Sequence, residues 1–251
     1  MSTPFDLHGK TAAVTGGGRG LGLGISDALL EAGADVIVFG RNPLPAELTA
    51  HAARLGRRVH FEALDLADSK AIAASAQRVL SAHQVEILVN NAGSQDRYPA
   101  VDFPLEAWDA VLNVNLRAVF QLCQLFGRPM LERGEGKIVN LASLLSFQGG
   151  MTVPAYAASK GAVAQLTKAL CNEWASRGVN VNAVAPGYMT TDMNTALLAD
   201  PVRTEQLSTR IPAGRWGQPQ DVGDVVVFLA SPAAAYVHGQ VLAVDGGWMA
   251  R

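Results

Sequence analysis

Near its N-terminus the chain carries the segment Thr11-Ala12-Ala13-Val14-Thr15-Gly16-Gly17-Gly18-Arg19-Gly20-Leu21-Gly22. Its first five residues are apolar or β-branched and predict a short buried strand. The glycines that follow tolerate positive φ and let the backbone approach another group closely. Beyond them, Leu21–Ala32 shows the apolar spacing of a helix. This order of strand, glycine-rich turn and helix predicts the opening unit of an α/β domain.

The same alternation continues to the end of the chain. Short runs rich in Val, Ile and Leu, apolar on both faces, indicate parallel strands that are covered on both sides. They are Thr11–Thr15, Asp35–Phe39, Val59–Glu62, Ile87–Asn90, Lys137–Leu141, Val179–Ala185 and Gln240–Val244. Helical patterns separate them over Leu21–Ala32, Pro45–Leu55, Asp68–His83, Leu105–Glu132, Tyr156–Ser176 and Asp221–Leu229. We therefore expect one domain over residues 1–251, an α/β doubly wound parallel sheet of about seven strands with the Rossmann fold.

Composition and charge exclude several classes of protein. The 251 residues include 20 Lys and Arg against 22 Asp and Glu, with no basic run, so no nucleic-acid partner is expected. No apolar stretch approaches the ~20 residues that span a bilayer, and the first residues lack the layout of a signal peptide. Two cysteines cannot form a disulfide framework, and the five histidines are not spaced as metal ligands. We expect a cytoplasmic enzyme with no metal and no membrane partner.

The glycine-rich turn predicts a dinucleotide site. A turn that opens a helix presents backbone N–H groups and the positive end of the helix dipole to a pyrophosphate. The second strand ends Phe39-Gly40-Arg41-Asn42, where a cofactor with a free ribose 2′-hydroxyl usually meets a carboxylate. Arg41 and Arg19 can instead pair with a 2′-phosphate. We therefore expect NADP(H) to be favoured, with NAD(H) as the alternative.

Four polar residues form a candidate catalytic set. Tyr156 and Lys160 lie four apart at the start of a predicted helix, which places them on one face. An ammonium group beside a phenol lowers the phenol pKa from ~10, so that Tyr156 becomes a usable acid or base. Ser143 follows the fifth strand, where an open parallel sheet presents its ligand crevice. Asn115 is a polar residue in a largely apolar helical pattern.

These residues and their neighbours resemble the motifs of the short-chain dehydrogenase/reductase family over essentially the whole chain. The matching positions are the glycine turn, Asn90-Asn91-Ala92-Gly93, the set Asn115, Ser143, Tyr156 and Lys160, Pro186-Gly187, and Val244-Asp245-Gly246-Gly247. The resemblance implies a homotetramer in which Tyr156 is the acid–base group. It also implies that Lys160 lowers the phenol pKa and holds the nicotinamide ribose, that Ser143 stabilises the reacting oxygen, and that Asn115 positions a water molecule.

The same resemblance implies a set of cofactor contacts. Asp65 and Leu66 would frame the adenine, and Asn91, Ala92 and Gly93 would line the ribose. Pro186, Gly187, Met189 and Thr191 would meet the nicotinamide end. With the turn and its flanks, the expected cofactor site contains Gly16, Arg19, Gly20, Leu21, Gly22, Arg41, Asp65, Leu66, Asn91, Ala92, Gly93, Tyr156, Lys160, Pro186, Gly187, Met189 and Thr191.

Segments of the second half are similar to a subgroup, the 2-dehydro-3-deoxy-D-gluconate 5-dehydrogenases. They include Ser146-Phe147-Gln148-Gly149-Gly150, Arg210-Ile211-Pro212-Ala213-Gly214-Arg215-Trp216-Gly217 and the tail from Ala243 to Arg251. A sugar acid needs a cation for its carboxylate and polar groups for its hydroxyls. Arg97 and Gln148, with Ser143 and Tyr156, are the predicted substrate residues. Arg210 and Arg215 are further candidates, for which a role as structural anchors is favoured.

Residues 189–217 form a long insertion after the sixth strand and are expected to act as a substrate loop. Two alternative functions stay open. A 3-oxoacyl-[acyl-carrier-protein] reductase shares most of the motifs, but its docking face should be basic, and Glu132-Arg133-Gly134-Glu135-Gly136-Lys137 is mixed in charge. A dinucleotide-sensing scaffold without turnover would not need Ser143, Tyr156 and Lys160 together.

Overall fold

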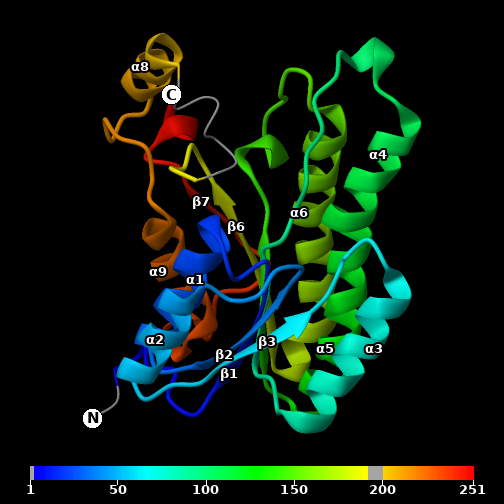
Figure 1. Cartoon of the computed structure of the whole chain (residues 1–251), viewed down its shortest axis with the longest axis vertical. Helices are drawn as coiled ribbons and strands as arrows, with labels where there is room; N and C mark the ends of the chain where they lie inside the picture. Colours follow the sequence, from blue (N-terminus) through cyan, green and yellow to red (C-terminus); the bar gives the residue numbers. More distant parts are fainter. Residues whose placement is uncertain (1–2, 192–199) are drawn as a thin grey trace.

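The computed structural model describes residues 3–191 and 200–251. In this part of the chain a single sheet contains seven parallel strands, as predicted, and their order is β3-β2-β1-β4-β5-β6-β7 (Figure 1). The strands are β1 Thr11–Thr15, β2 Asp35–Gly40, β3 Val59–Ala63, β4 Ile87–Asn90, β5 Gly136–Leu141, β6 Val179–Pro186 and β7 Val241–Val244. Strand order reverses between β1 and β4, and this reversal marks the crevice where such sheets bind ligands.

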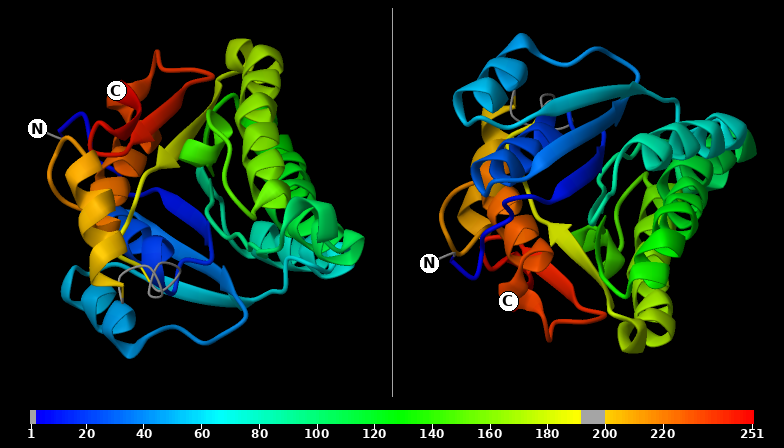
Figure 2. Two further views of the ribbon diagram at one scale, coloured as in Figure 1. Left: turned by 90° about the horizontal axis from the view of Figure 1, so that it is seen from above. Right: turned by 90° about the horizontal axis from the view of Figure 1, so that it is seen from below.

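Helices cover both faces of the sheet, so that the molecule has three layers (Figure 2). Successive residues of β1 point to opposite faces: Ala12 and Val14 belong to one core cluster and Ala13 to the other. The first cluster packs against α1 (Gly20–Glu31), α2 (Ala46–Arg54) and α9 (Pro219–Ala230). The second packs against α3 (Ser69–Ala82), α5 (Ala118–Arg133) and α6 (Pro154–Trp174). Burial on both faces explains why the strands are continuously apolar.

The prediction of one continuous helix over Leu105–Glu132 is wrong. The structure divides it into α4 (Leu105–Leu112), a π-helical segment (Asn113–Arg117) and α5. A π-helical turn inserts one extra residue into the helix and rotates the side chains around it. The side chain of Asn115, fully buried, bonds to the backbone of Ser94 on the other side of the crevice. The irregular turn therefore places a polar side chain where a regular helix would continue its apolar stripe.

The predicted substrate loop contains secondary structure of its own. Within the described residues, α8 spans Pro201–Arg210, and an isolated bridge pairs Met189 with Gly217. Backbone bonds from Gly217 N–H to the Tyr188 carbonyl (2.9 Å) and from Thr190 N–H to the Gly217 carbonyl (2.8 Å) join its two ends. Residues 192–199 of this predicted loop lie outside the described residues. The base of the segment is thus tied to the carboxyl end of β6.

None of the helices in the described ranges combines the length and the apolar character needed to cross a membrane.

Candidate active site

The carboxyl ends of β1 and β4 are joined through one buried hydroxyl. Thr15 is 1% exposed, and its Oγ1 accepts hydrogen bonds from the backbone N–H groups of Asn91 and Ala92, both at 3.0 Å. The Asn91 side chain returns a bond from Nδ2 to the Thr15 carbonyl oxygen at 2.9 Å. These bonds fix the segment 91–93 beside the glycine-rich turn at the point where strand order reverses.

The glycine-rich turn is shaped by close backbone approach. A Cβ on Gly22 would lie 2.0 Å from the Gly16 carbonyl oxygen, so only glycine lets α1 pack against the turn. Gly20 has φ +51° and lies beside Thr191, the last described residue before the gap. Helix α1 begins at Gly20, and no side chain caps its first turn. The first backbone N–H groups of α1 therefore have no side-chain cap, and such helix starts can bind anions.

Arg19 and Arg41 lie at the outer end of this crevice. Both side chains are exposed, and within the described part of the chain neither forms an ion pair. Asp65 is exposed and caps its own turn by accepting from Ala67 N–H at 3.0 Å, while Leu66 packs against the second core cluster. The Leu64 N–H bond to the Gly40 carbonyl (2.8 Å) holds the ends of β2 and β3 together. The predicted adenine-side residues thus follow two adjacent strand ends.

Ser143, Tyr156 and Lys160 are brought together between the end of β5 and the first turns of α6. The Ser143 hydroxyl faces the Tyr156 phenol closely enough to lower its pKa, and Lys160 Nζ lies 5.7 Å from the centre of the Tyr156 ring. Lys160 is 4% exposed, and its Nζ donates to the Leu141 carbonyl oxygen at 2.5 Å. The predicted set therefore converges on one point of the crevice.

Burial controls the titration of both groups. It raises the pKa of the Tyr156 phenol, and the Ser143 hydrogen bond opposes that rise because it stabilises the phenolate. Burial also lowers the pKa of the Lys160 ammonium to about 8. From the sequence, Lys160 was expected to lower the phenol pKa. In the structure the largest effect on the Tyr156 pKa is burial, which raises it. The Lys160 ammonium donates its hydrogen bond to the Leu141 carbonyl.

Asn115 connects three segments around the same point. Its Oδ1 accepts from Ser94 N–H at 2.8 Å, and its Nδ2 donates to the Ser94 carbonyl (2.8 Å) and to Ser159 Oγ (3.1 Å). The Ser159 hydroxyl in turn donates to the Tyr156 carbonyl at 2.7 Å. A Cβ on Gly93 would lie 3.2 Å from Asn115 Oδ1 and 3.8 Å from Lys160 Nζ. Asn115 Oδ1 and Lys160 Nζ therefore both lie near Gly93, and the hydrogen bonds of Asn115 join it to Ser94 and Ser159.

The other wall of the crevice comes from β6 and β7. Gly187 N–H donates to the Val244 carbonyl at 2.9 Å, and a Cβ on Gly187 would lie 2.7 Å from Asp245 Cα. Pro186 ends β6, and Met189 is buried at 3% exposure. These predicted residues follow the strand that neighbours β5, so they face the same edge of the sheet as Ser143.

The structure separates the candidate substrate residues into two groups. Arg97 and Gln148 are exposed on the loops that follow β4 and β5. Arg210 instead stacks on the indole of Trp248, 4.0 Å from its centre. Arg215 forms a two-bond ion pair with Asp221 (2.7 and 2.8 Å). Arg210 and Arg215 thus have structural partners, whereas Arg97 and Gln148 remain the candidates for binding a substrate.

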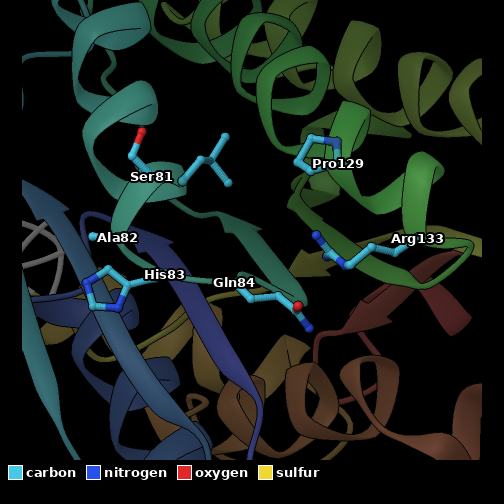
Figure 3. A pocket seen from close by; sticks show the side chains of 7 residues that line it. Ser81, Ala82, His83, Gln84, Pro129 and Arg133 are labelled. Atoms are coloured by element: carbon cyan, nitrogen blue, oxygen red, sulfur yellow. The ribbon is translucent and has the colours of Figure 1, made fainter.

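A separate hollow of about 320 Å³ lies at the opposite end of the sheet, between the ends of α3 and α5 (Figure 3). Its lining includes His83, Gln84, Pro129 and Arg133. Arg133 donates to the Val85 carbonyl at 2.8 Å and Gln84 to Glu86 at 2.5 Å, so both are engaged in holding the start of β4. This hollow is not part of the crevice that holds Tyr156.

Two serines beside the site were not singled out from the sequence. Ser159 is fully buried and joins Asn115 to α6, and Ser146 joins Ser143 to Lys160. A serine at a buried position of an apolar helix was a usable signal for Ser159. Ser146 had no comparable local signal, because its partner lies 14 residues away in the sequence.

With this geometry in place, comparison with known proteins identifies relatives of the whole chain. A family model described as enoyl-(acyl carrier protein) reductase matches residues 16–249. The 2-dehydro-3-deoxy-D-gluconate 5-dehydrogenase of Bacillus subtilis is 53% identical over 98% of this chain and 97% of its own.

Solved structures give the same result. A Beutenbergia cavernae protein crystallised with NADP at low occupancy is 50% identical, with a TM-score of 0.96 over 99% of this chain and 100% of that one. A gluconate 5-dehydrogenase from Burkholderia cenocepacia in complex with NADP and tartrate is 40% identical, with a TM-score of 0.91 over 99% and 98% of the two chains. The chain therefore belongs to the short-chain dehydrogenase/reductase family and is an NAD(P)-dependent oxidoreductase of CH–OH groups.

Proposed function

We propose that the protein interconverts a secondary alcohol and a ketone on a small sugar acid, with 2-dehydro-3-deoxy-D-gluconate at C5 as the substrate and NADP(H) as the favoured cofactor. The observation that carries this proposal is the convergence of Ser143, Tyr156 and Lys160 at the carboxyl edge of the sheet. Four relatives that are 45–53% identical carry the name of this dehydrogenase, which supports the substrate.

The residues present fit a dinucleotide. The uncapped start of α1 and the close approach of Gly22 to Gly16 provide the anion cradle. Arg19 and Arg41 are exposed cations without ion-pair partners among the described residues, and a 2′-phosphate supplies the missing charge. Asn91, Ala92 and Gly93 would line the ribose, and Pro186, Gly187, Met189 and Thr191 would meet the nicotinamide. When bound, this cofactor accepts or delivers the hydride.

The chain's own residues manage the proton and the oxygen. In oxidation, the Tyr156 phenolate takes the hydroxyl proton of the alcohol, while the hydrogen on the alcohol carbon leaves with both electrons of its C–H bond as hydride. In reduction, the phenol returns that proton to the carbonyl oxygen. Ser143 donates its hydroxyl hydrogen to the same oxygen and stabilises negative charge there. Lys160 Nζ, held 5.7 Å from the Tyr156 ring centre, stabilises the phenolate and binds ribose hydroxyls.

Arg97 and Gln148 are proposed to bind the sugar acid. Both are exposed beside the crevice, on the two loops that follow β4 and β5. A guanidinium can take the carboxylate with two parallel hydrogen bonds, and an amide can bond a hydroxyl through either of its atoms. The segment 189–217, which starts at the end of β6, is proposed to cover the substrate.

A spectrophotometric screen at 340 nm tests this function directly. It compares 2-dehydro-3-deoxy-D-gluconate, gluconate and an acetoacetyl thioester with NADP(H) and with NAD(H). We expect the highest kcat/KM for the first substrate with the phosphorylated cofactor. A higher kcat/KM for the thioester would favour an acyl-carrier reductase, and NADPH binding without any turnover would favour a sensing scaffold.

We propose the homotetramer that the family resemblance implies, and a cytoplasmic location. Phe120, 40% exposed on the outer surface of α5, is apolar area available for a subunit contact. Light scattering at micromolar concentration tests the assembly, and a monomer would contradict it.

A further inference from the structure

The hydroxyl of Ser146 bonds to both of the segments that carry the candidate acid–base residues. Ser146 closes the short 3-10 turn Leu144–Ser146, which begins immediately after Ser143. Its Oγ donates to the Lys160 carbonyl oxygen at 2.7 Å and accepts from Ser143 N–H at 3.3 Å. One side-chain atom therefore connects the end of β5 to the catalytic turn of α6.

The direction of these bonds also orients the Ser143 hydroxyl. A serine hydroxyl has one hydrogen to donate and two lone pairs that accept. The Ser143 Oγ accepts from Leu145 N–H at 3.2 Å, within the same turn, and its hydrogen is directed to Tyr156. Accepting from Leu145 N–H thus leaves the Ser143 hydrogen available to the Tyr156 phenol. If the turn moves away from α6, the Ser143–Tyr156 bond lengthens.

Few other hydrogen bonds join this turn to α6, although Leu144 also packs in an apolar cluster with Ile211 and Trp248. Among the described residues, segment 141–146 bonds to α6 through Lys160 Nζ to the Leu141 carbonyl, through Ser143 to Tyr156, and through Ser146. The first two involve groups whose hydrogen bonds change when they bind cofactor and substrate. The Ser146 bond is the one that requires no catalytic side chain, so it can persist through the reaction.

We propose that Ser146 is a positioning residue, which holds the turn after β5 against α6 and so keeps the Ser143 hydroxyl at the Tyr156 phenol. This inference rests on the proposed function, because it takes Tyr156 as the acid–base group. It also places the following residue pair, Phe147 and Gln148, since the N–H groups of both bond to the Leu144 carbonyl of the same turn (2.9 and 3.1 Å). Ser146 thereby fixes the base of the loop that presents Gln148.

Ser146→Ala tests the proposal, with Ser146→Thr as the rescue variant because it retains the hydroxyl. We expect Ser146→Ala to lower kcat at least tenfold while the Kd for NADPH stays within twofold of wild type, since a misplaced catalytic group affects the chemical step. The rising limb of the oxidation pH profile should move to higher pH, because the phenolate loses a hydrogen bond that stabilises it. Ser146→Thr should recover kcat to within about threefold.

Ser81→Ala is the matched control. Ser81 also donates to a helix carbonyl (Gln77, 2.8 Å), but on α3, at the opposite end of the sheet. We expect it to leave kcat and the pH profile unchanged. If Ser146→Ala does not fold, Ser146→Cys replaces it, because a thiol of similar size bonds more weakly and should give an intermediate loss.

A substrate-independent measurement separates this proposal from the proposed function. Ultraviolet titration of the Tyr156 phenol in the presence of NADP, identified by difference from Tyr156→Phe, should show a higher midpoint in Ser146→Ala. That result supports the positioning role even if the sugar acid is not the substrate. An unchanged midpoint, or a Ser146→Ala enzyme that retains more than half of the wild-type kcat, would overturn it.

Discussion

Replacing Lys160 with methionine should remove a stability penalty along with the activity. The ammonium is 4% exposed, and its described hydrogen-bond partner is a neutral carbonyl, Leu141. Burial lowers the pKa of this group from 10.5 to about 8, which at ~1.4 kcal/mol per unit corresponds to about 3 kcal/mol. At pH 7 the folded protein therefore carries a charge that costs it roughly this amount relative to the unfolded chain. Methionine has a similar length and no charge.

The sign of the pH dependence follows from which state holds the proton. Between pH 8 and 10.5 the unfolded chain retains the Lys160 proton, and the folded protein has lost it. The free energy of unfolding of the wild type should therefore rise with pH relative to Lys160→Met, by about 3 kcal/mol across this window. Below pH 8 the difference in the free energy of unfolding between the two proteins is constant, and the advantage of Lys160→Met over the wild type is largest there.

Urea unfolding, followed by tryptophan fluorescence without cofactor, measures this difference. Both proteins are compared at pH 7, 8, 9 and 10 and at one fixed protein concentration, so that subunit association affects them equally. The contributions of other titrating groups to the free energy of unfolding are the same in both proteins and cancel in the difference. Lys168→Met, on an exposed position of the same helix, is the control and should show no such trend. A difference between wild type and Lys160→Met that stays flat from pH 7 to 10 would refute the reasoning.

Three further substitutions test the proposed roles. Tyr156→Phe should lower kcat at least a thousandfold, because the proton donor is lost, while NADPH binding measured by fluorescence stays within about twofold. Retention of wild-type turnover would exclude Tyr156 as the acid–base group. Arg41→Ala should lower kcat/KM for NADPH ten- to hundredfold and leave NADH unaffected, and an equal loss for both cofactors would rule out 2′-phosphate recognition. Arg97→Ala should raise KM for sugar acids but not for an uncharged secondary alcohol, and equal KM changes for the two would argue against a carboxylate contact.

The fold was predictable because each buried strand is marked by an apolar run in its own sequence. β1, β2 and β4 are buried on both faces, so their apolar runs end where the strands end. The π-helical turn at Asn113–Arg117 was not predictable from the same pattern. Its two asparagines and valine are weak helix formers but do not specify a π-helical turn, and Asn115 is held there by Ser94, 21 residues away. A distant contact therefore overrides the local periodicity.

The candidate site also contains features that the local sequence predicts and features that depend on distant contacts. The glycine turn was predicted because close approach and positive φ are properties of glycine itself, as at Gly22 and Gly20. The structural partners of Arg210 and Arg215 depend on where Trp248 and Asp221 lie in space. The sequence favoured a structural role for both arginines but could not name these partners. The contact of Ser146 was not predictable from the sequence for the same reason, since its bond to Lys160 exists only once β5 and α6 are packed together.

The titration of Tyr156 shows what the tertiary structure adds to the chemistry. The i, i+4 spacing placed Lys160 on the same helix face, which suggested a lowered phenol pKa. In the fold, Lys160 Nζ donates to the Leu141 carbonyl. Burial is the largest effect on the Tyr156 pKa and favours the neutral phenol, while the Ser143 hydroxyl opposes this effect. The neutral phenol is the proton donor that ketone reduction needs, and the phenolate is the base that alcohol oxidation needs. A site biased towards the neutral phenol therefore supports reduction at neutral pH, and oxidation should gain as pH rises. The contact from Ser143, which we infer that Ser146 maintains, lowers the pH at which the phenolate forms and so opposes the effect of burial.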